Sequence, residues 1–290
     1  MYGVLALVQV LFGIHYAVAK ELLLWMEPAA WATLRIIVAA LVLQAFVFRR
    51  GGGLPRSPRE WVHVAGLALC GVVVNQVCFI EGLSRTIPAH SALIMTTIPL
   101  WTVAFATLLR RERLTLRRAT AIGCGLVGVW TLLRADRFHL ELDLLPGDLL
   151  TLVNAAAYGL FLVVSKRYVA GMDASVATAR IFAVGAIGVA AYGMDELVAT
   201  DLTSLPGSFW LLAAYAILGA TVIAHGLNLW ALRRAVSSLV ALFIYLQPIV
   251  ATAVDGFLLG RWPSWRFAVA AVLVFLGVGL GLSMSRRRGN

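Results

Sequence analysis

The chain has 290 residues, of which 61% are hydrophobic and only 13% are charged, and its mean hydropathy is +0.89. A soluble domain is roughly 45–50% apolar and about 25% charged, so the composition excludes an ordinary soluble fold and predicts a protein that resides in the lipid bilayer. The net charge of +10 does not indicate a nucleic-acid partner, because the arginines stand in short clusters between apolar runs, as in membrane proteins.

Ten apolar segments are long enough to cross a bilayer as helices, which requires about 20 residues each. In chain order they are residues 2–21, 29–48, 60–83, 88–109, 115–134, 147–169, 174–194, 208–232, 236–259 and 264–284. The connections are too short for a soluble domain. The first segment lacks the basic region and cleavage site of a signal peptide, so we expect it to be retained. The sequence therefore predicts an all-α membrane protein with ten transmembrane helices.

Lysine and arginine residues near the ends of the segments predict the orientation. With the N-terminus in the cytoplasm, 16 of the 24 basic residues fall in cytoplasmic connections and six fall outside. We therefore expect a multi-pass protein of a bacterial inner membrane with both termini in the cytoplasm.

The chain contains an internal repeat with a nearly constant spacing of 145 to 149 residues. The matching pairs are Gly13 and Gly159, Lys20 and Lys166, Arg35 and Arg180, Gly71 and Gly219, and Pro99 and Pro248. They predict two homologous five-helix halves, residues 1–135 and 146–290. Because five is odd, the second half enters the membrane from the opposite side, and such inverted repeats are typical of alternating-access transporters.

Motifs in both halves support a family resemblance. The first half has FGIHYAVAK, then Pro28 and LRIIVAALVL, and later IPLWTVAFATLLRRERLT, with a proline in mid-helix and a glutamate before the next span. The second half has Arg234, Pro248 and the run Leu276-Gly277-Val278-Gly279 at corresponding places. In this order the chain resembles the EamA family of the drug/metabolite transporter superfamily.

The resemblance implies a transporter with a central cavity lined by spans 1–4 and 6–9, with spans 5 and 10 to one side. It also implies traffic of small metabolites, often the export of amino acids or drugs. The chain departs from the family pattern at two positions, with Arg261 where a second glutamate would stand and Phe12 where a tryptophan is usual. Both departures leave the substrate open.

Polar residues within membrane helices tend to face the interior of the bundle, because they find hydrogen-bond partners there. We expect them, with several aromatic residues, to line a substrate-binding cavity. The expected residues are His15, Tyr16, Arg35, Asn75, Gln76, Trp101, Asn154, Tyr158, Asn228, Tyr245 and Gln247. An aromatic lining with amide groups suits an amphipathic organic solute such as an aromatic amino acid or a quaternary amine.

Arg35 and Arg180 stand inside the second and seventh spans, where an arginine is costly. One interpretation is that they bind an anionic group of the substrate. The other is structural, with each guanidinium bonded to a helix end or a carboxylate. Because both halves keep the arginine and a substrate is not symmetric, the sequence favours the structural interpretation.

A second group of residues is expected in gating or coupling. Its members are Glu81, Pro99, His225, Pro248 and Asp255. The two acids stand near the outer ends of spans, where either could pair with Arg85 or Arg261 as an outer gate or take up a proton during transport; the sequence favours the salt bridge. The histidine, like His15, is a candidate for proton coupling. Each proline frees a backbone carbonyl one turn earlier and so bends its helix.

These features predict a transporter of a small metabolite, an amino acid, amine or drug-like solute, that works as an exporter by alternating access. No catalytic constellation and no metal-ligand spacing is found, so we expect neither an enzyme nor a cofactor. A lipid flippase or a non-transporting membrane protein on the same fold is the alternative. The expected assembly is a monomer or a homodimer.

Overall fold

The computed structural model describes residues 1–48, 53–86, 88–133, 142–259 and 265–286, with the backbone alone for residues 88–89, 255–259 and 283–286. Every regular element within these ranges is helical. In order they are α1 (Tyr2–Leu22), α2 (Pro28–Phe48), α3 (Pro58–Ala68), η1 (Leu69–Val74), α4 (Asn75–Arg85), α5 (Pro88–Met95), α6 (Ile98–Leu108), α7 (Leu116–Leu132), α8 (Leu145–Ala170), α9 (Ala174–Ala199), η3 (Leu202–Ser204), α10 (Gly207–Ala214), η4 (Tyr215–Ile223), α11 (Ala224–Leu232), α12 (Ser237–Leu242), η5 (Phe243–Tyr245), α13 (Leu246–Leu259) and α14 (Trp265–Arg286).

Nine helices in the described ranges are long and apolar enough to cross a membrane, so the chain is an all-α, multi-pass membrane protein. Helices are expected in a lipid bilayer, because each backbone polar group there must form its hydrogen bond within the chain. The remaining expected span is α7, which has 17 residues and is followed by residues 134–141 outside the described part.

Short polar connections stop and restart the helices. Ser57, Thr115 and Asp173 stand in extended conformation directly before α3, α7 and α9, and each side chain accepts a hydrogen bond from a backbone N–H of the following turn. These N-caps satisfy donors that the helix itself leaves unpaired. The caps thus fix where three of the spans begin.

Two spans contain a π-helical segment, which the sequence analysis did not predict. The segment η1 joins α3 to α4, and η4 joins α10 to α11. Gly71 in η1 allows close contact with α8, because a Cβ atom there would lie 2.4 Å from the ring of Phe161. Segments of this kind are frequent at functional sites. Both lead directly into the residues of the cavity described below.

The two prolines interrupt their spans more strongly than a simple bend. Residues 88–109 were expected to form one helix, but α5 ends at Met95 and α6 begins at Ile98, with the hydroxyls of Thr96 and Thr97 bonded to preceding carbonyls. In the second half a 3₁₀ turn, η5, separates α12 from α13 just before Pro248. Proline lacks the N–H that would continue the ladder and clashes with the carbonyl four residues earlier.

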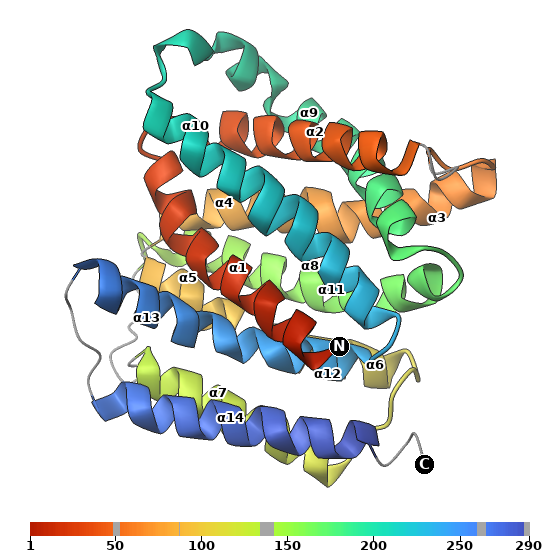
Figure 1. The fold of residues 1–290 in the computed structure, drawn as a ribbon, viewed down its shortest axis with the longest axis vertical. Helices are drawn as coiled ribbons and strands as arrows, with labels where there is room; N and C mark the ends of the chain where they lie inside the picture. Colours follow the sequence, from red (N-terminus) through yellow and green to blue (C-terminus); the bar gives the residue numbers. More distant parts are fainter. Residues whose placement is uncertain (49–52, 87, 134–141, 260–264, 287–290) are drawn as a thin grey trace.

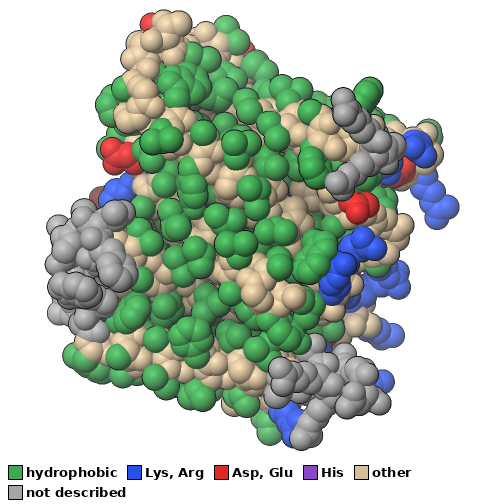
Figure 2. Space-filling model, viewed as in Figure 1, with side chains coloured by type: hydrophobic (Ala, Val, Ile, Leu, Met, Phe, Trp, Pro, Cys, Tyr) green, Lys and Arg blue, Asp and Glu red, His purple; other side chains and the backbone are tan. Residues whose placement is uncertain are grey.

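The helices form a bundle with a distinct pair at each edge (Figure 1). In it α2 packs along α9 at one edge and α7 along α14 at the other, with the remaining spans between them. Hydrophobic side chains cover most of the visible face, and lysines and arginines gather along one side, where α3 begins and α6 ends (Figure 2). An apolar belt with charge at its end is the surface expected of a protein in a bilayer.

Candidate functional site

A cavity lies in the middle of the bundle, between helices of both halves of the chain. Its lining residues come from α1, α2, α4, α5, α6, α8, η4, α11 and α13 and are Phe12, His15, Tyr16, Arg35, Asn75, Gln76, Phe79, Met95, Ile98, Asn154, Tyr158, Ala220, Thr221, His225 and Gln247. The helix α9, the seventh span, contributes none of them, although the resemblance implied that it would. Its Phe182 instead packs edge-on against His225, with ring centroids 5.1 Å apart.

Arg35 is the charged group of this cavity. It stands seven residues after Pro28, which begins α2, or about 10 Å along the helix axis. The side chain is buried, with Nη1 2.7 Å from His15 Nε2 and Nη2 donating to Gln76 Oε1. No carboxylate within the described part of the chain forms an ion pair with it. Within the described ranges the guanidinium is therefore held by neutral groups alone.

The hydrogen bond to Arg35 determines the tautomer of His15. A guanidinium donates and cannot accept, so the neutral ring must accept through Nε2 and carry its proton on Nδ1. That Nδ1 is buried and has no hydrogen-bond partner among the described residues. The Nε of Arg35 and the Oδ1 of Asn154 are in the same condition. Buried polar groups normally have partners, so these three mark a place where a ligand can bond.

Amide side chains continue this polar site across the bundle. Gln76 donates to Asn75 Oδ1 at 2.7 Å, and Asn154 of α8 donates to the Asn75 backbone carbonyl. Near α13, Gln247 donates to Gln9 Oε1 at 2.7 Å. These bonds join helices of both halves around the cavity and hold the amide groups in fixed orientations.

The aromatic part of the wall is formed by edge contacts. Phe12 meets His225 with ring centroids 5.2 Å apart, and Tyr16 meets Phe79 at 5.8 Å. Edge-to-face geometry is favourable for aromatic pairs and presents their apolar surface to the cavity. The site thus combines one cation and several amides with a largely aromatic wall.

Three of the residues expected at the cavity lie elsewhere. Trp101 is half-buried and packs on Phe105, with ring centroids 5.9 Å apart. Asn228 lies behind the lining and donates to the hydroxyl of Tyr158 at 2.9 Å. Tyr245 is fully buried against Gly125, and its hydroxyl has no partner among the described residues. Helix rotation separates them from the residues that do line the cavity.

The residues expected in gating or coupling are also dispersed. Glu81 forms the expected ion pair with Arg85 at 2.7 Å and accepts a hydrogen bond from the Tyr192 hydroxyl at 2.5 Å. His225 lines the cavity, with Nδ1 3.1 Å from the Thr221 carbonyl. The prolines lie at the helix breaks already described, and the side chain of Asp255 lies outside the described part of the structure.

Arg180, the repeat partner of Arg35, lies outside the cavity at the start of α3. It forms an ion pair with Glu60 and donates from Nε to the Gly53 carbonyl at 3.1 Å. Glu60 also accepts from the Tyr168 hydroxyl at 3.3 Å and from the Arg56 backbone N–H at 2.9 Å. This arginine therefore has the carboxylate partner that the structural interpretation requires.

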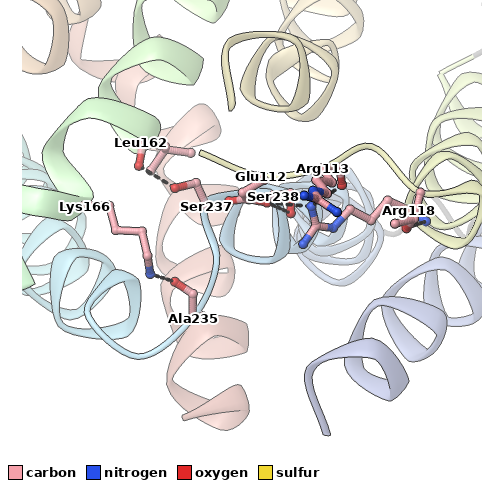
Figure 3. A network of polar contacts seen from close by, with 9 residues as sticks. Glu112, Arg113, Arg118, Leu162, Lys166, Ala235, Ser237 and Ser238 are labelled. Carbon is pink, nitrogen blue, oxygen red and sulfur yellow. Dashed lines mark hydrogen bonds and ion pairs between the residues drawn. The ribbon is translucent and has the colours of Figure 1, made fainter. Parts of the chain in front are cut away.

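A polar network at the basic side of the molecule joins the α6–α7 connection to α12 (Figure 3). Glu112 accepts from the backbone N–H of Ser238 at 3.3 Å and from its hydroxyl at 2.5 Å, and forms an ion pair with Arg118 at 3.3 Å. The carboxylate thus lies at the N-terminus of α12, where a negative charge is stabilised. Lys166 donates to the carbonyls of Leu232 and Ala235 at the end of α11.

A second buried carboxylate joins the halves at the other end of α8. Asp148 accepts a hydrogen bond from the Thr86 hydroxyl at 2.5 Å and lies 3.1 Å from His90 Nδ1. Since α8 has 26 residues, Asp148 and Lys166 near its two ends are separated by roughly 27 Å along the axis. This contact gives no signal in the sequence, because neither Asp148 nor His90 stands in a repeated motif.

Several lining residues were also missed. They are Phe79, Met95, Ile98, Ala220 and Thr221. Apart from Thr221, these are apolar residues in apolar spans, which give no signal in the sequence. Phe12 also lines the cavity, but the sequence indicated it only as a departure from the family pattern. Among the described residues no cluster of His, Cys, Asp and Glu side chains could hold a metal ion.

The comparisons with known proteins agree with this architecture. The sequence pattern of the EamA-like transporter family matches residues 1–134 and again residues 145–282. An uncharacterized transporter of Archaeoglobus fulgidus is 25% identical over 282 residues, which cover 92% of this chain and 96% of the relative. The uncharacterized inner membrane transporter YedA of Escherichia coli is 26% identical over 288 residues, with coverages of 96% and 91%.

A solved crystal structure of another protein has the same fold. It superposes with a TM-score of 0.80 over 99% of this chain and 98% of its own length, at 23% identity.

Proposed function

Since the chain belongs to the EamA-like transporter family, we propose that it carries a small organic metabolite across the bacterial inner membrane by alternating access, as an exporter. The observation that supports this most directly is the cavity of buried polar residues in the middle of an apolar helix bundle. Such residues are costly within a membrane and mark pathways for substrates or ions. The name of the Escherichia coli relative supports the location, and the family resemblance supports the direction.

The proposal includes two inverted five-helix repeats, residues 1–135 and 146–290, with α7 as the fifth of ten spans. The double match of the family pattern supports it. So do the two π segments, which begin at Leu69 and Tyr215, 146 residues apart, close to the spacing of the sequence motifs. In transporters of this design the substrate site lies at the interface between the repeats, and the cavity has lining residues from both.

Alternating access requires contacts that open in turn at the two ends of the cavity. Glu112 at one end and Asp148 at the other each link the first half to the second. Opening the pathway on either side would separate one of these carboxylates from its partners, while the cavity residues stay together. The helix breaks before Pro99 and Pro248 are the places where such bending costs least.

The proposed orientation places both termini in the cytoplasm. It is supported by the basic side chains along the side of the molecule where α3 begins and α6 ends (Figure 2). Fusions of a reporter that is active only in the periplasm should be inactive at residue 290 and active after residue 200. The reverse pattern would contradict the orientation.

The function is tested by flux into and out of proteoliposomes that contain the purified full-length protein. Amino acids, amines, organic acids and drug-like solutes are loaded, and release is compared with liposomes that lack protein. Release of a solute supports a transporter, and its dependence on an imposed pH difference tests proton coupling through His15 and His225. Movement of labelled phospholipid between leaflets with no solute flux would instead favour a flippase.

A further inference from the structure

The cavity contains a buried cation without a counter-charge among the described side chains. Arg35 is 2% exposed, and the described carboxylates that form ion pairs do so with other residues. It is hydrogen-bonded to the ring of His15 and the amide oxygen of Gln76, and its Cζ lies 6.0 Å from the centroid of the Trp31 ring. A charge held in a membrane bundle by neutral groups alone is costly, so it requires a function that needs the charge.

The guanidinium also has N–H donors that make no hydrogen bond to a described residue. Of its five N–H groups, two point to His15 and Gln76, and the one on Nε is buried with no partner among the described residues. His15 carries its proton on Nδ1, which is also buried and has no partner in the described part of the chain. Two unused donors therefore belong to side chains that contact each other and line the same cavity.

We propose that Arg35, held in place by His15, binds the carboxylate group of a small organic acid, so that the substrate class is a monocarboxylate; this rests on the proposed transport function. A carboxylate has two oxygens that accept bonds from the arginine fork, and the combination of charge and geometry makes these bonds strong. One cation in the cavity matches one negative charge. A dianion such as a phosphate ester would leave one charge uncompensated.

The other lining residues indicate the chemistry of the rest of this acid. Phe12, Tyr16 and Phe79 form an aromatic wall that suits an apolar side chain. The buried Oδ1 of Asn154 can accept a hydrogen bond and has no partner within the described ranges, so it fits an amino or hydroxyl group of the same ligand. Amines that lack a carboxylate are disfavoured, because like charges repel strongly in a site of low dielectric.

The binding test uses two sets of ligands; the members of each set share an apolar body and differ in whether they carry a carboxylate, an amino group or both. The thermal unfolding midpoint of the purified protein is measured with phenylalanine, 3-phenylpropanoate, phenylalaninamide and 2-phenylethylamine, and with leucine, 4-methylpentanoate, leucinamide and 3-methylbutylamine. We expect stabilisation by carboxylates and not by the amides or amines of the same body. Stabilisation by amines, equal stabilisation by all members of a set, or none by any carboxylate overturns the proposal.

Substitution identifies the residue that recognises the charge. Arg35→Gln should raise the Kd of a stabilising carboxylate about 30-fold or more, and Arg35→Lys should raise it less, because lysine keeps the charge but loses the fork. Arg180→Gln is the matched control and should leave the Kd unchanged. An unchanged Kd in Arg35→Gln would assign recognition to other residues. If that variant does not fold, Arg35→Lys and the ligand series still decide.

The outcomes separate this inference from the proposed function. Suppose that a solute without a carboxylate is transported in proteoliposomes and no acid binds. The transport function would then be supported, and the role of Arg35 in substrate recognition would be wrong. If a carboxylate binds through Arg35 but is never transported, the binding site would be supported and the transport function contradicted.

Discussion

The two arginines of the sequence repeat have opposite surroundings. Arg35 lies in the central cavity against a histidine and an amide, without a carboxylate among the described residues. Arg180 lies at the start of α3, where it pairs with Glu60 and the Gly53 carbonyl. The sequence favoured one structural role for both, on the argument of symmetry. Equivalent positions in a repeat thus share a backbone but not a chemical role, because each half packs against a different neighbour.

The largest expected effect is on transport. Arg35→Gln should lower the kcat/KM for a carboxylate substrate by about 30- to 1,000-fold, since it removes the charge that we propose binds the carboxylate. Flux into proteoliposomes measures it, with Arg180→Gln at equal protein content as the control. Equal losses in both variants would mean that the two arginines act alike after all.

The next largest effect is on stability, through the contacts of Glu112 with Arg118 and α12. Glu112→Gln should lower the free energy of unfolding by about 2 kcal/mol, because it leaves Arg118 without its buried ion pair and removes a charge from the N-terminus of α12. Thermal or denaturant unfolding in detergent gives the value. The exposed Glu196→Gln is the control and should change it by less than about 0.5 kcal/mol. Equal values would show that the network of Figure 3 contributes no stability.

For stability the order of the two arginines should be the opposite of that for transport, with the larger effect at Arg180. Arg180→Gln should lower the free energy of unfolding by about 1–2 kcal/mol, because Glu60 is only partly exposed and loses its partner. Arg35→Gln should have little effect or stabilise the protein without ligand, because it removes a buried charge. The exposed Arg167→Gln is the control. A larger cost at Arg35 than at Arg180 would contradict the division of roles.

The smallest effect concerns two buried tyrosines. Tyr158→Phe should cost about 1 kcal/mol of unfolding free energy, since Asn228 loses its acceptor. Tyr245→Phe should be neutral or slightly stabilising, because the hydroxyl it removes is buried and has no described partner. The pair is measured side by side by thermal unfolding. A greater loss at Tyr245 would reveal a partner for its hydroxyl.

The sequence by itself determined much of the fold. Apolar runs of sufficient length predicted the spanning helices, and nine are present in the described ranges. The prolines predicted where two spans are interrupted, although the break at Thr96-Thr97 is sharper than the expected bend. Polar residues within apolar runs indicated many of the polar side chains that line the cavity, including His15 and Gln247. These features are local, because lipid imposes the same requirement on each backbone and polar group separately.

Only the tertiary structure decided which side of each helix faces the cavity. Trp101, Asn228 and Tyr245 have the right residue types but lie outside the lining, whereas Met95 and Ile98 line it without any signal in the sequence. The π segments and the different partners of Arg35 and Arg180 were equally unreadable. Lipid is as apolar as the core of the bundle, so hydrophobicity does not distinguish the two sides of a membrane helix. Rotation and pairing therefore depend on packing between residues far apart in the chain.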